Sequence, residues 1–123
     1  MSKEKIGVLI AEDSEGLLQL LVRTMEKDQR LEVKGVARNG EEALQKIPTW
    51  KPDVVTLDVE MPVMNGLDAL RKIMEMHPVP VLMVSSLTTK GAEETLQALE
   101  LGAIDFIPKQ LDGVVTNISS VQN

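Results

Sequence analysis

The feature that most constrains this chain is a regular alternation between short, mostly apolar runs and longer amphipathic stretches. Five such runs are separated by stretches in which apolar residues recur every three or four positions. A short apolar run is typical of a strand covered on both faces, and the longer period is typical of a helix packed on one side. The expected strands are residues 7–11, 33–37, 54–57, 81–84 and 104–107.

The expected helices between these strands have recognisable ends. Ser14 is placed to cap the first helix, and Asn39 with Glu42 resembles a capping box at the start of the second. The second helix is expected to stop near Pro48, and Gly102 is expected to end the fourth. The expected buried faces are Leu18, Leu21, Val22 and Met25, then Leu67, Leu70, Ile73 and Met74, then Ala92, Leu96, Leu99 and Ala103; a last short helix is expected over Leu111–Val121.

Five strands that alternate with helices predict an α/β domain built on a parallel sheet. Right-handed crossovers place helices on both faces of such a sheet. We therefore expect a doubly wound, flavodoxin-like (βα)5 fold with the strand order 2-1-3-4-5. The spacing alone leaves other doubly wound orders open.

Length and composition exclude several classes of function. The 123 residues fit one domain, and the net charge of −6 argues against binding nucleic acid or anionic lipid through bulk charge. The chain has no Cys, which excludes thiolate metal sites and cysteine nucleophiles. No apolar run approaches the roughly 20 residues that span a membrane, and the first residues do not resemble a signal peptide. We expect a cytoplasmic protein.

Polar residues follow the strands at the edge where parallel sheets bind their ligands. Glu12 and Asp13 follow the first strand, Asp58 ends the third, Ser85 ends the fourth and Lys109 follows the fifth. In the expected strand order the first and third strands are neighbours. We therefore expect the three carboxylates to lie together, flanked by a hydroxyl and an ammonium group.

Three clustered carboxylates need a proton or a cation to relieve their repulsion, which is about 4 kcal/mol for a pair at about 4 Å near a protein surface. Hard oxygen ligands favour Mg2+, with Mn2+ or Ca2+ as alternatives. Glu12 and Asp13 also suit a simpler role as acids at the start of a helix.

Asp58 suits either the role of a metal ligand or that of a nucleophile that accepts a phosphoryl group. Lys109 would then stabilise the transferred charge and Ser85 would bind the phosphoryl group; the simpler alternatives are a surface lysine and a strand-ending serine.

Motifs for competing chemistries are missing from the sequence. Neither a G-x-x-x-x-G-K-[ST] loop nor a G-x-G-x-x-G turn follows the first strand. A Ser-His-Asp triad would have to use His77, which is the sole histidine and lies beside Pro78 at an expected helix end, away from the acidic residues.

The sequence resembles the receiver domain of two-component response regulators over residues 6–109. The resemblance is carried by Glu12-Asp13, Asp58-x-x-Met61-Pro62-x-Met64-x-Gly66, Ser85 and Lys109. It implies that the acidic pair, Asp58 and the backbone carbonyl of Glu60 bind Mg2+. It also implies that a sensor histidine kinase supplies a phosphoryl group to Asp58, that Ser85 moves to meet it, and that Phe106 rotates inward.

Within that family the chain looks like the chemotaxis methylesterase branch. Residues 56–62, 84–88 and 98–106 carry this narrower resemblance. Members of the branch have a C-terminal methylesterase domain, whereas residues 1–123 are expected to form a single receiver domain, either cut from a longer protein or acting alone. Glu12 replaces the commoner Asp, and Gln110 replaces the usual Pro after Lys109, so a trans Lys109–Gln110 bond is expected.

The leading hypothesis is thus a phosphorylation switch whose partners are a sensor histidine kinase and its own missing effector domain, acting as a monomer or as a phosphorylation-dependent dimer. The alternative is a receiver-like interaction module that works without phosphorylation. A small metal-dependent phosphatase ranks last, because no second general acid or base is expected near Asp58.

Overall fold

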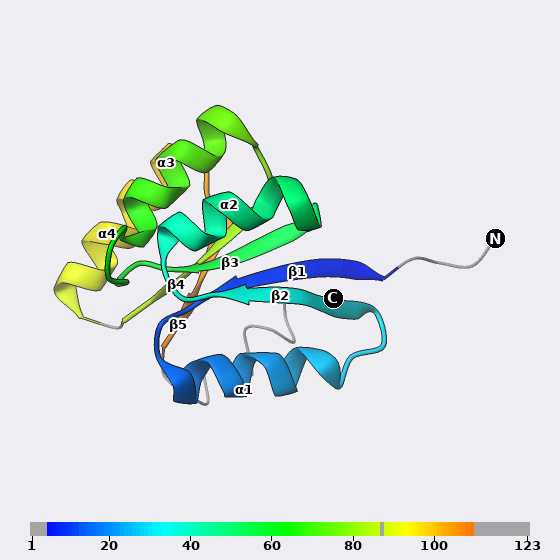
Figure 1. The fold of residues 1–123 in the computed structure, drawn as a ribbon. Helices are drawn as coiled ribbons and strands as arrows, with labels where there is room; N and C mark the ends of the chain where they lie inside the picture. Colours follow the sequence, from blue (N-terminus) through cyan, green and yellow to red (C-terminus); the bar gives the residue numbers. More distant parts are fainter. Residues whose placement is uncertain (1–4, 87, 110–123) are drawn as a thin grey trace.

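The computed structural model describes residues 5–86 and 88–109. Strands and helices alternate along this part of the chain (Figure 1). The strands are β1 (Ile6–Ala11), β2 (Leu31–Ala37), β3 (Val54–Asp58), β4 (Val81–Ser85) and β5 (Asp105–Pro108), and the helices are α1 (Glu15–Glu26), α2 (Gly40–Trp50), α3 (Gly66–Met76) and α4 (Thr89–Leu101). The last expected helix, residues 111–121, and the Lys109–Gln110 bond lie outside the described residues.

The five strands form one parallel sheet in the order β2-β1-β3-β4-β5, which confirms the predicted flavodoxin-like topology. Helix α1 covers one face of the sheet, while α2, α3 and α4 cover the other (Figure 1). Strand β1 pairs with β3 up to Ala11 opposite Leu57. The chain order therefore reverses between these two strands, and their carboxyl ends lie at the same edge of the sheet.

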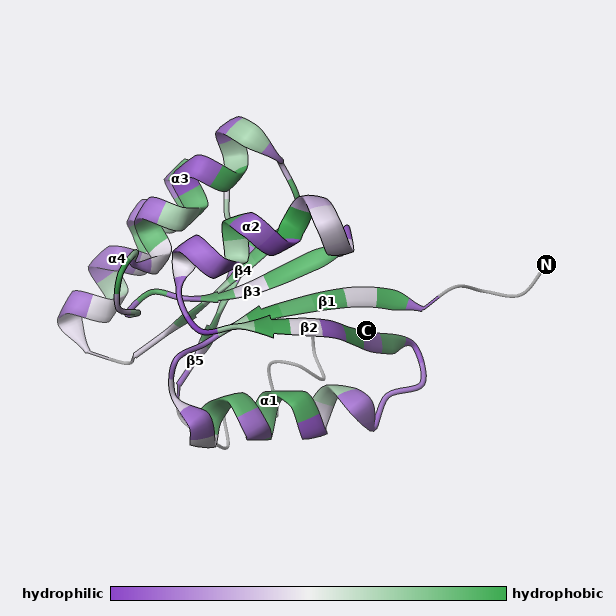
Figure 2. Cartoon of the chain, in the orientation of Figure 1, coloured by the Kyte–Doolittle hydropathy of each residue, from purple (hydrophilic) through white to green (hydrophobic). Residues whose placement is uncertain are grey.

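The core has one layer on each face of the sheet. Leu9, Leu57 and Met83 are fully buried under α2, α3 and α4, whereas Ile10 and Ile107 are fully buried on the α1 side. The apolar sides of the helices face the sheet and their polar sides face outward (Figure 2). Alternate residues of a strand thus enter opposite layers, which explains why the central strands are apolar at nearly every position.

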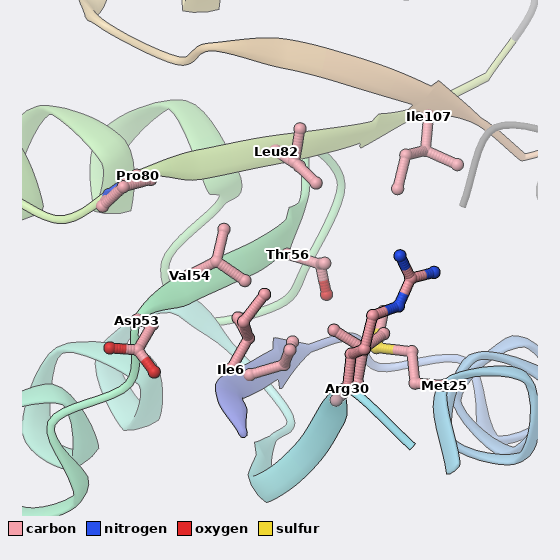
Figure 3. Close-up of a pocket in the computed structure, with 11 residues that line it drawn as sticks. Ile6, Met25, Arg30, Asp53, Val54, Thr56, Pro80, Leu82 and Ile107 are labelled. Atoms are coloured by element: carbon pink, nitrogen blue, oxygen red, sulfur yellow. The ribbon is translucent and has the colours of Figure 1, made fainter. Parts of the chain in front are cut away.

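The α1 face of the sheet also borders a cavity of about 300 Å3 (Figure 3). Its lining includes Met25 from α1 and Val54, Leu82 and Ile107 from the strands. The hydroxyl of Thr56 points into it and has no hydrogen-bond partner within the described part of the chain. Among the described helices, α1 is the one that packs on this face of the sheet, and the other three pack on the opposite face.

The helix ends follow the prediction, except that Ser14 at the start of α1 makes no capping hydrogen bond with its side chain. Asn39 caps α2 by accepting a hydrogen bond from the Glu42 N–H at 2.9 Å, as expected, and Gly102 ends α4 with φ +118°. Helix α2 stops near Pro48, as expected, although it runs two residues past it to Trp50. A proline lacks the N–H that would bond one turn back, but the following turn is closed by the Lys51 N–H, which donates to Ile47 O at 2.8 Å.

The prediction of which face of α4 is buried was wrong. Leu96 and Leu99 are exposed, at 62% and 39%, whereas Gly91, Thr95 and Ala98 are buried. The helix packs on β4 and α3 through its small residues. The spacing of large apolar residues does not predict such a face, because small residues become buried where two elements approach closely.

Candidate functional site

The carboxylates expected at the sheet edge do lie together. Glu12 directly follows β1 and Asp58 ends the neighbouring β3, and both side chains are fully buried. Asp13 is exposed beside them. One carboxylate oxygen from each of the three residues lies within 4.8 Å of the other two. The fold therefore concentrates three acidic groups at the point where the strand order reverses.

Backbone contacts hold the two buried carboxylates in place. The N–H of Ser14 donates to Glu12 Oε2 at 3.0 Å, and the N–H of Glu60 donates to Asp58 Oδ1 at 3.1 Å. The segment after Asp58 folds back on itself so closely that a Cβ at Gly66 would lie 2.1 Å from the Asp58 carbonyl oxygen. Glycine is therefore required at position 66 for the turn that presents Asp58.

Lys109 supplies the positive charge expected beside Asp58. Its backbone N–H donates to the backbone carbonyl of Ser85 at 2.8 Å, which fixes the end of β5 against β4. Its Nζ lies 2.9 Å from Asp58 Oδ1 and 3.8 Å from Glu60 Oε1. Partial burial opposes the charged form, but the hydrogen bond and the charge of Asp58 outweigh it and raise the pKa of Lys109. The ammonium group is thus held in its charged form over the carboxylate.

Lys109 alone does not balance the charge of the three carboxylates. Glu12 Oε1 and Asp58 Oδ2 are buried acceptors without a donor among the residues that the structure describes. Burial, followed by the neighbouring Asp58, raises the pKa of Glu12 to about 8. Two unpartnered carboxylate oxygens beside the exposed Asp13 fit a hard divalent cation, which would replace the missing donors.

The Ser85 hydroxyl is not directed at the acidic cluster in this structure, and Phe106 is partly exposed. The Ser85 hydroxyl donates to Gly91 O at 3.1 Å and accepts from Thr95 Oγ1 at 3.0 Å, so it is directed toward α4. The side chain of Phe106 is 38% exposed. Thr95 was not singled out from the sequence, because it stands among polar and charged residues of an amphipathic helix. Its burial becomes visible only when the register of α4 is known.

Comparison with known proteins identifies the family. The model of the response regulator receiver domain matches residues 8–115. The chain belongs to this family. It is 56% identical over 118 residues to protein-glutamate methylesterase/protein-glutamine glutaminase 2 of Nitratidesulfovibrio vulgaris, covering 96% of this chain and 32% of that protein. It is 50% identical over 123 residues to the protein-glutamate methylesterase/protein-glutamine glutaminase of Pyrococcus abyssi, covering 100% of this chain and 33% of that protein.

Solved structures agree with this assignment. The response regulator domain of Thermotoga maritima CheB superposes with a TM-score of 0.89 at 38% identity, covering 96% of this chain and 93% of that one. CheY in a CheX-CheY-BeF3-Mg complex from Borrelia burgdorferi gives a TM-score of 0.82 at 30% identity, covering 98% of this chain and 91% of that one. The chain is thus a CheB-like receiver domain whose acidic pocket is consistent with a phosphorylation site, and it spans about a third of the length of its curated relatives.

None of the described helices combines the length and the apolar character that crossing a bilayer requires.

Proposed function

We propose that this domain accepts a phosphoryl group on Asp58 from a sensor histidine kinase, in a Mg2+-dependent reaction in the cytoplasm. The observation that carries the proposal is the environment of the Asp58 carboxylate. One of its oxygens is bound by Lys109 Nζ and the Glu60 N–H, and the other lies unpartnered beside Glu12 within the described residues. A carboxylate held in this way is oriented and is supported by positive charge.

The chemistry follows from these contacts. A carboxylate oxygen of Asp58 donates an electron pair to the phosphorus of a phosphohistidine, so that an O–P bond forms while the P–N bond breaks. The bonding electrons stay on the imidazole nitrogen, and the leaving imidazole takes up a proton from solvent. Lys109 remains beside the new acyl phosphate and offsets its charge. Mg2+ held by Glu12, Asp13, Asp58 and the carbonyl of Glu60 would screen the phosphoryl oxygens.

The proposed switch uses the side chains that point away from Asp58 at rest. Ser85 would leave α4 and hydrogen-bond the phosphoryl group, and Phe106 would turn inward into the space that becomes free. Leu96, Leu99 and Phe106 are exposed on α4 and β5, so this movement would change an apolar surface. The change would alter contacts with an effector domain or produce a phosphorylation-dependent dimer.

The experiment is incubation with Mg2+ and acetyl phosphate, followed by intact-mass measurement. The wild type is expected to gain one phosphoryl group, Asp58→Asn none, and the matched surface variant Asp68→Asn the same as the wild type. Chelation of Mg2+ should abolish the gain. Equal phosphorylation of Asp58→Asn, or none in the wild type, would reject the proposal and favour an interaction module that works without phosphorylation.

A wider role follows from the relatives. We infer that this domain is the receiver part of a longer protein in which it controls a methylesterase domain during chemotactic adaptation. Support comes from the names of the relatives and from their length, which is about three times that of this chain. Sequencing the gene beyond the codon for Asn123 tests this inference, because an open reading frame that encodes no such domain would contradict it.

A further inference from the structure

We propose that Thr95 is a positioning residue that holds the Ser85 hydroxyl away from Asp58 in the resting domain. The proposal rests on the proposed function, because it concerns how readily Ser85 becomes available to a phosphoryl group. Thr95 lies in the middle of α4, ten residues after Ser85, and its side chain is among the few polar groups in the core.

In this set of hydrogen bonds, Thr95 donates to Ser85 and Ser85 donates to Gly91. Ser85 Oγ is 2% exposed and donates its single proton to Gly91 O at 3.1 Å, with Ser86 O more distant at 3.3 Å. Its oxygen then accepts from Thr95 Oγ1 at 3.0 Å, so that Thr95 is the donor. Thr95 itself is 7% exposed. Both buried hydroxyls therefore have partners in this arrangement.

Contacts at the first turn of α4 hold the Gly91 carbonyl close to Ser85. The hydroxyl of Thr88 accepts from the Gly91 N–H at 3.0 Å and lies 3.0 Å from Ser86 Oγ, which ties the helix start to the loop after β4. A Cβ at Gly91 would lie 2.2 Å from Ser86 O. Because the helix approaches the loop this closely, the Gly91 carbonyl can reach Ser85.

Turning Ser85 toward Asp58 therefore breaks two hydrogen bonds and leaves the buried Thr95 donor without its acceptor. A buried hydrogen bond changes such an equilibrium by about three- to ten-fold. A phosphoryl group shifts the population only by its differential binding to the two states. Removing the Thr95 hydroxyl should therefore favour the state in which Ser85 is free to bind the phosphoryl group.

The test is the affinity for beryllofluoride, a phosphoryl mimic, in the presence of Mg2+, measured by isothermal titration calorimetry. Thr95→Val keeps the shape of the side chain and removes the donor, and it is expected to bind about three- to ten-fold more tightly than the wild type. Thr95→Ser keeps the donor and should stay within two-fold of the wild type. Thr95→Ala removes the same hydroxyl without a β-branched side chain and should change affinity in the same direction as Thr95→Val.

A double-mutant cycle with Ser85→Ala shows whether Thr95 acts through Ser85. The Thr95→Val change should alter affinity less than two-fold in the Ser85→Ala background. An unchanged affinity of Thr95→Val in the wild-type background would overturn the proposal and would mean that Thr95 simply turns to the Gly91 carbonyl when Ser85 leaves. An equal gain in the Ser85→Ala background would also overturn it. If the wild type fails to bind, or if Asp58→Asn binds as well as the wild type, the proposed function fails too.

Discussion

At the scale of single residues, Glu12 makes the stability of the metal-free domain depend on pH. Its pKa is raised from 4.5 to about 8 in the folded protein, mainly by burial. A raised pKa means that folding favours the protonated carboxyl, so the stabilisation is complete below pH 4.5 and is lost as the pH rises toward 8. In a chelator, the free energy of unfolding should therefore fall between pH 5 and pH 8, as measured by urea denaturation.

The variant Glu12→Gln isolates this contribution, because a neutral amide of similar size does not titrate. Its free energy of unfolding should change less over the same range of pH than that of the wild type. The matched variant Glu15→Gln removes an exposed carboxylate at the start of α1 and should leave the slope of the wild type unchanged. Parallel profiles for the wild type and Glu12→Gln would show that Glu12 is ionised throughout.

The residues of the site were predictable to the extent that the strands determine them. Glu12 and Asp58 follow directly from the topology, since the carboxyl ends of neighbouring parallel strands meet at one edge. The direction of the Ser85 hydroxyl does not follow from the topology, because it depends on a helix carbonyl and on Thr95. Those contacts arise from the close packing of α4, which leaves no periodic signal in the sequence.

At the scale of elements, the edge strand β2 is protected by contacts from α2. Lys34 is the extra residue where the register of β2 against β1 shifts, and Lys46 donates to Val36 O from the helix. The Trp50 ring lies against Gly35 so closely that a Cβ there would come 1.6 Å from it, and Lys46 Nζ lies 4.9 Å from the ring centre. The helix thus covers one face of this edge strand, and Lys46 occupies one of its backbone carbonyls.

Replacing Gly35 with Ala tests this packing. The added methyl group displaces the Trp50 ring, and we expect a loss of about 1–3 kcal/mol in the free energy of unfolding. Gly16→Ala is the matched control, because nothing lies within 4 Å of a Cβ there. It should stabilise α1 by up to about 1 kcal/mol. Urea denaturation followed by the fluorescence of the single tryptophan measures both changes, and equal effects of the two variants would contradict this account.

The elements themselves were largely predictable, but the buried face of α4 was not. The spacing of Leu96 and Leu99 indicated a buried face, but close approach at Gly91 selects small residues instead. Pro48 indicated that α2 stops nearby, and the helix ends two residues later at Trp50, whose ring packs on β2. At α4 a tertiary contact thus outweighs the preference that the apolar spacing of the sequence indicates.

At the scale of the whole molecule, part of the net charge of −6 is concentrated where the strand order reverses. Glu12 precedes α1, Asp58 ends a central strand, and Lys109 follows β5, so the site connects segments that are distant in the chain. These segments separate when the protein unfolds, so the unfolded chain does not retain the cluster that could bind a cation. A cation that binds there binds the folded state alone and stabilises the entire domain.

We therefore expect Mg2+ to raise the free energy of unfolding at pH 8. At a concentration ten times its dissociation constant the gain is about 1.4 kcal/mol, because only the folded state binds the ion. Asp13→Asn removes an exposed member of the cluster and should lose most of the gain, whereas Asp68→Asn, an exposed aspartate in the first turn of α3, should keep it. Sodium chloride at equal ionic strength separates binding from screening. An equal gain from sodium chloride, or an undiminished gain in Asp13→Asn, would place the stabilising ion elsewhere on the protein.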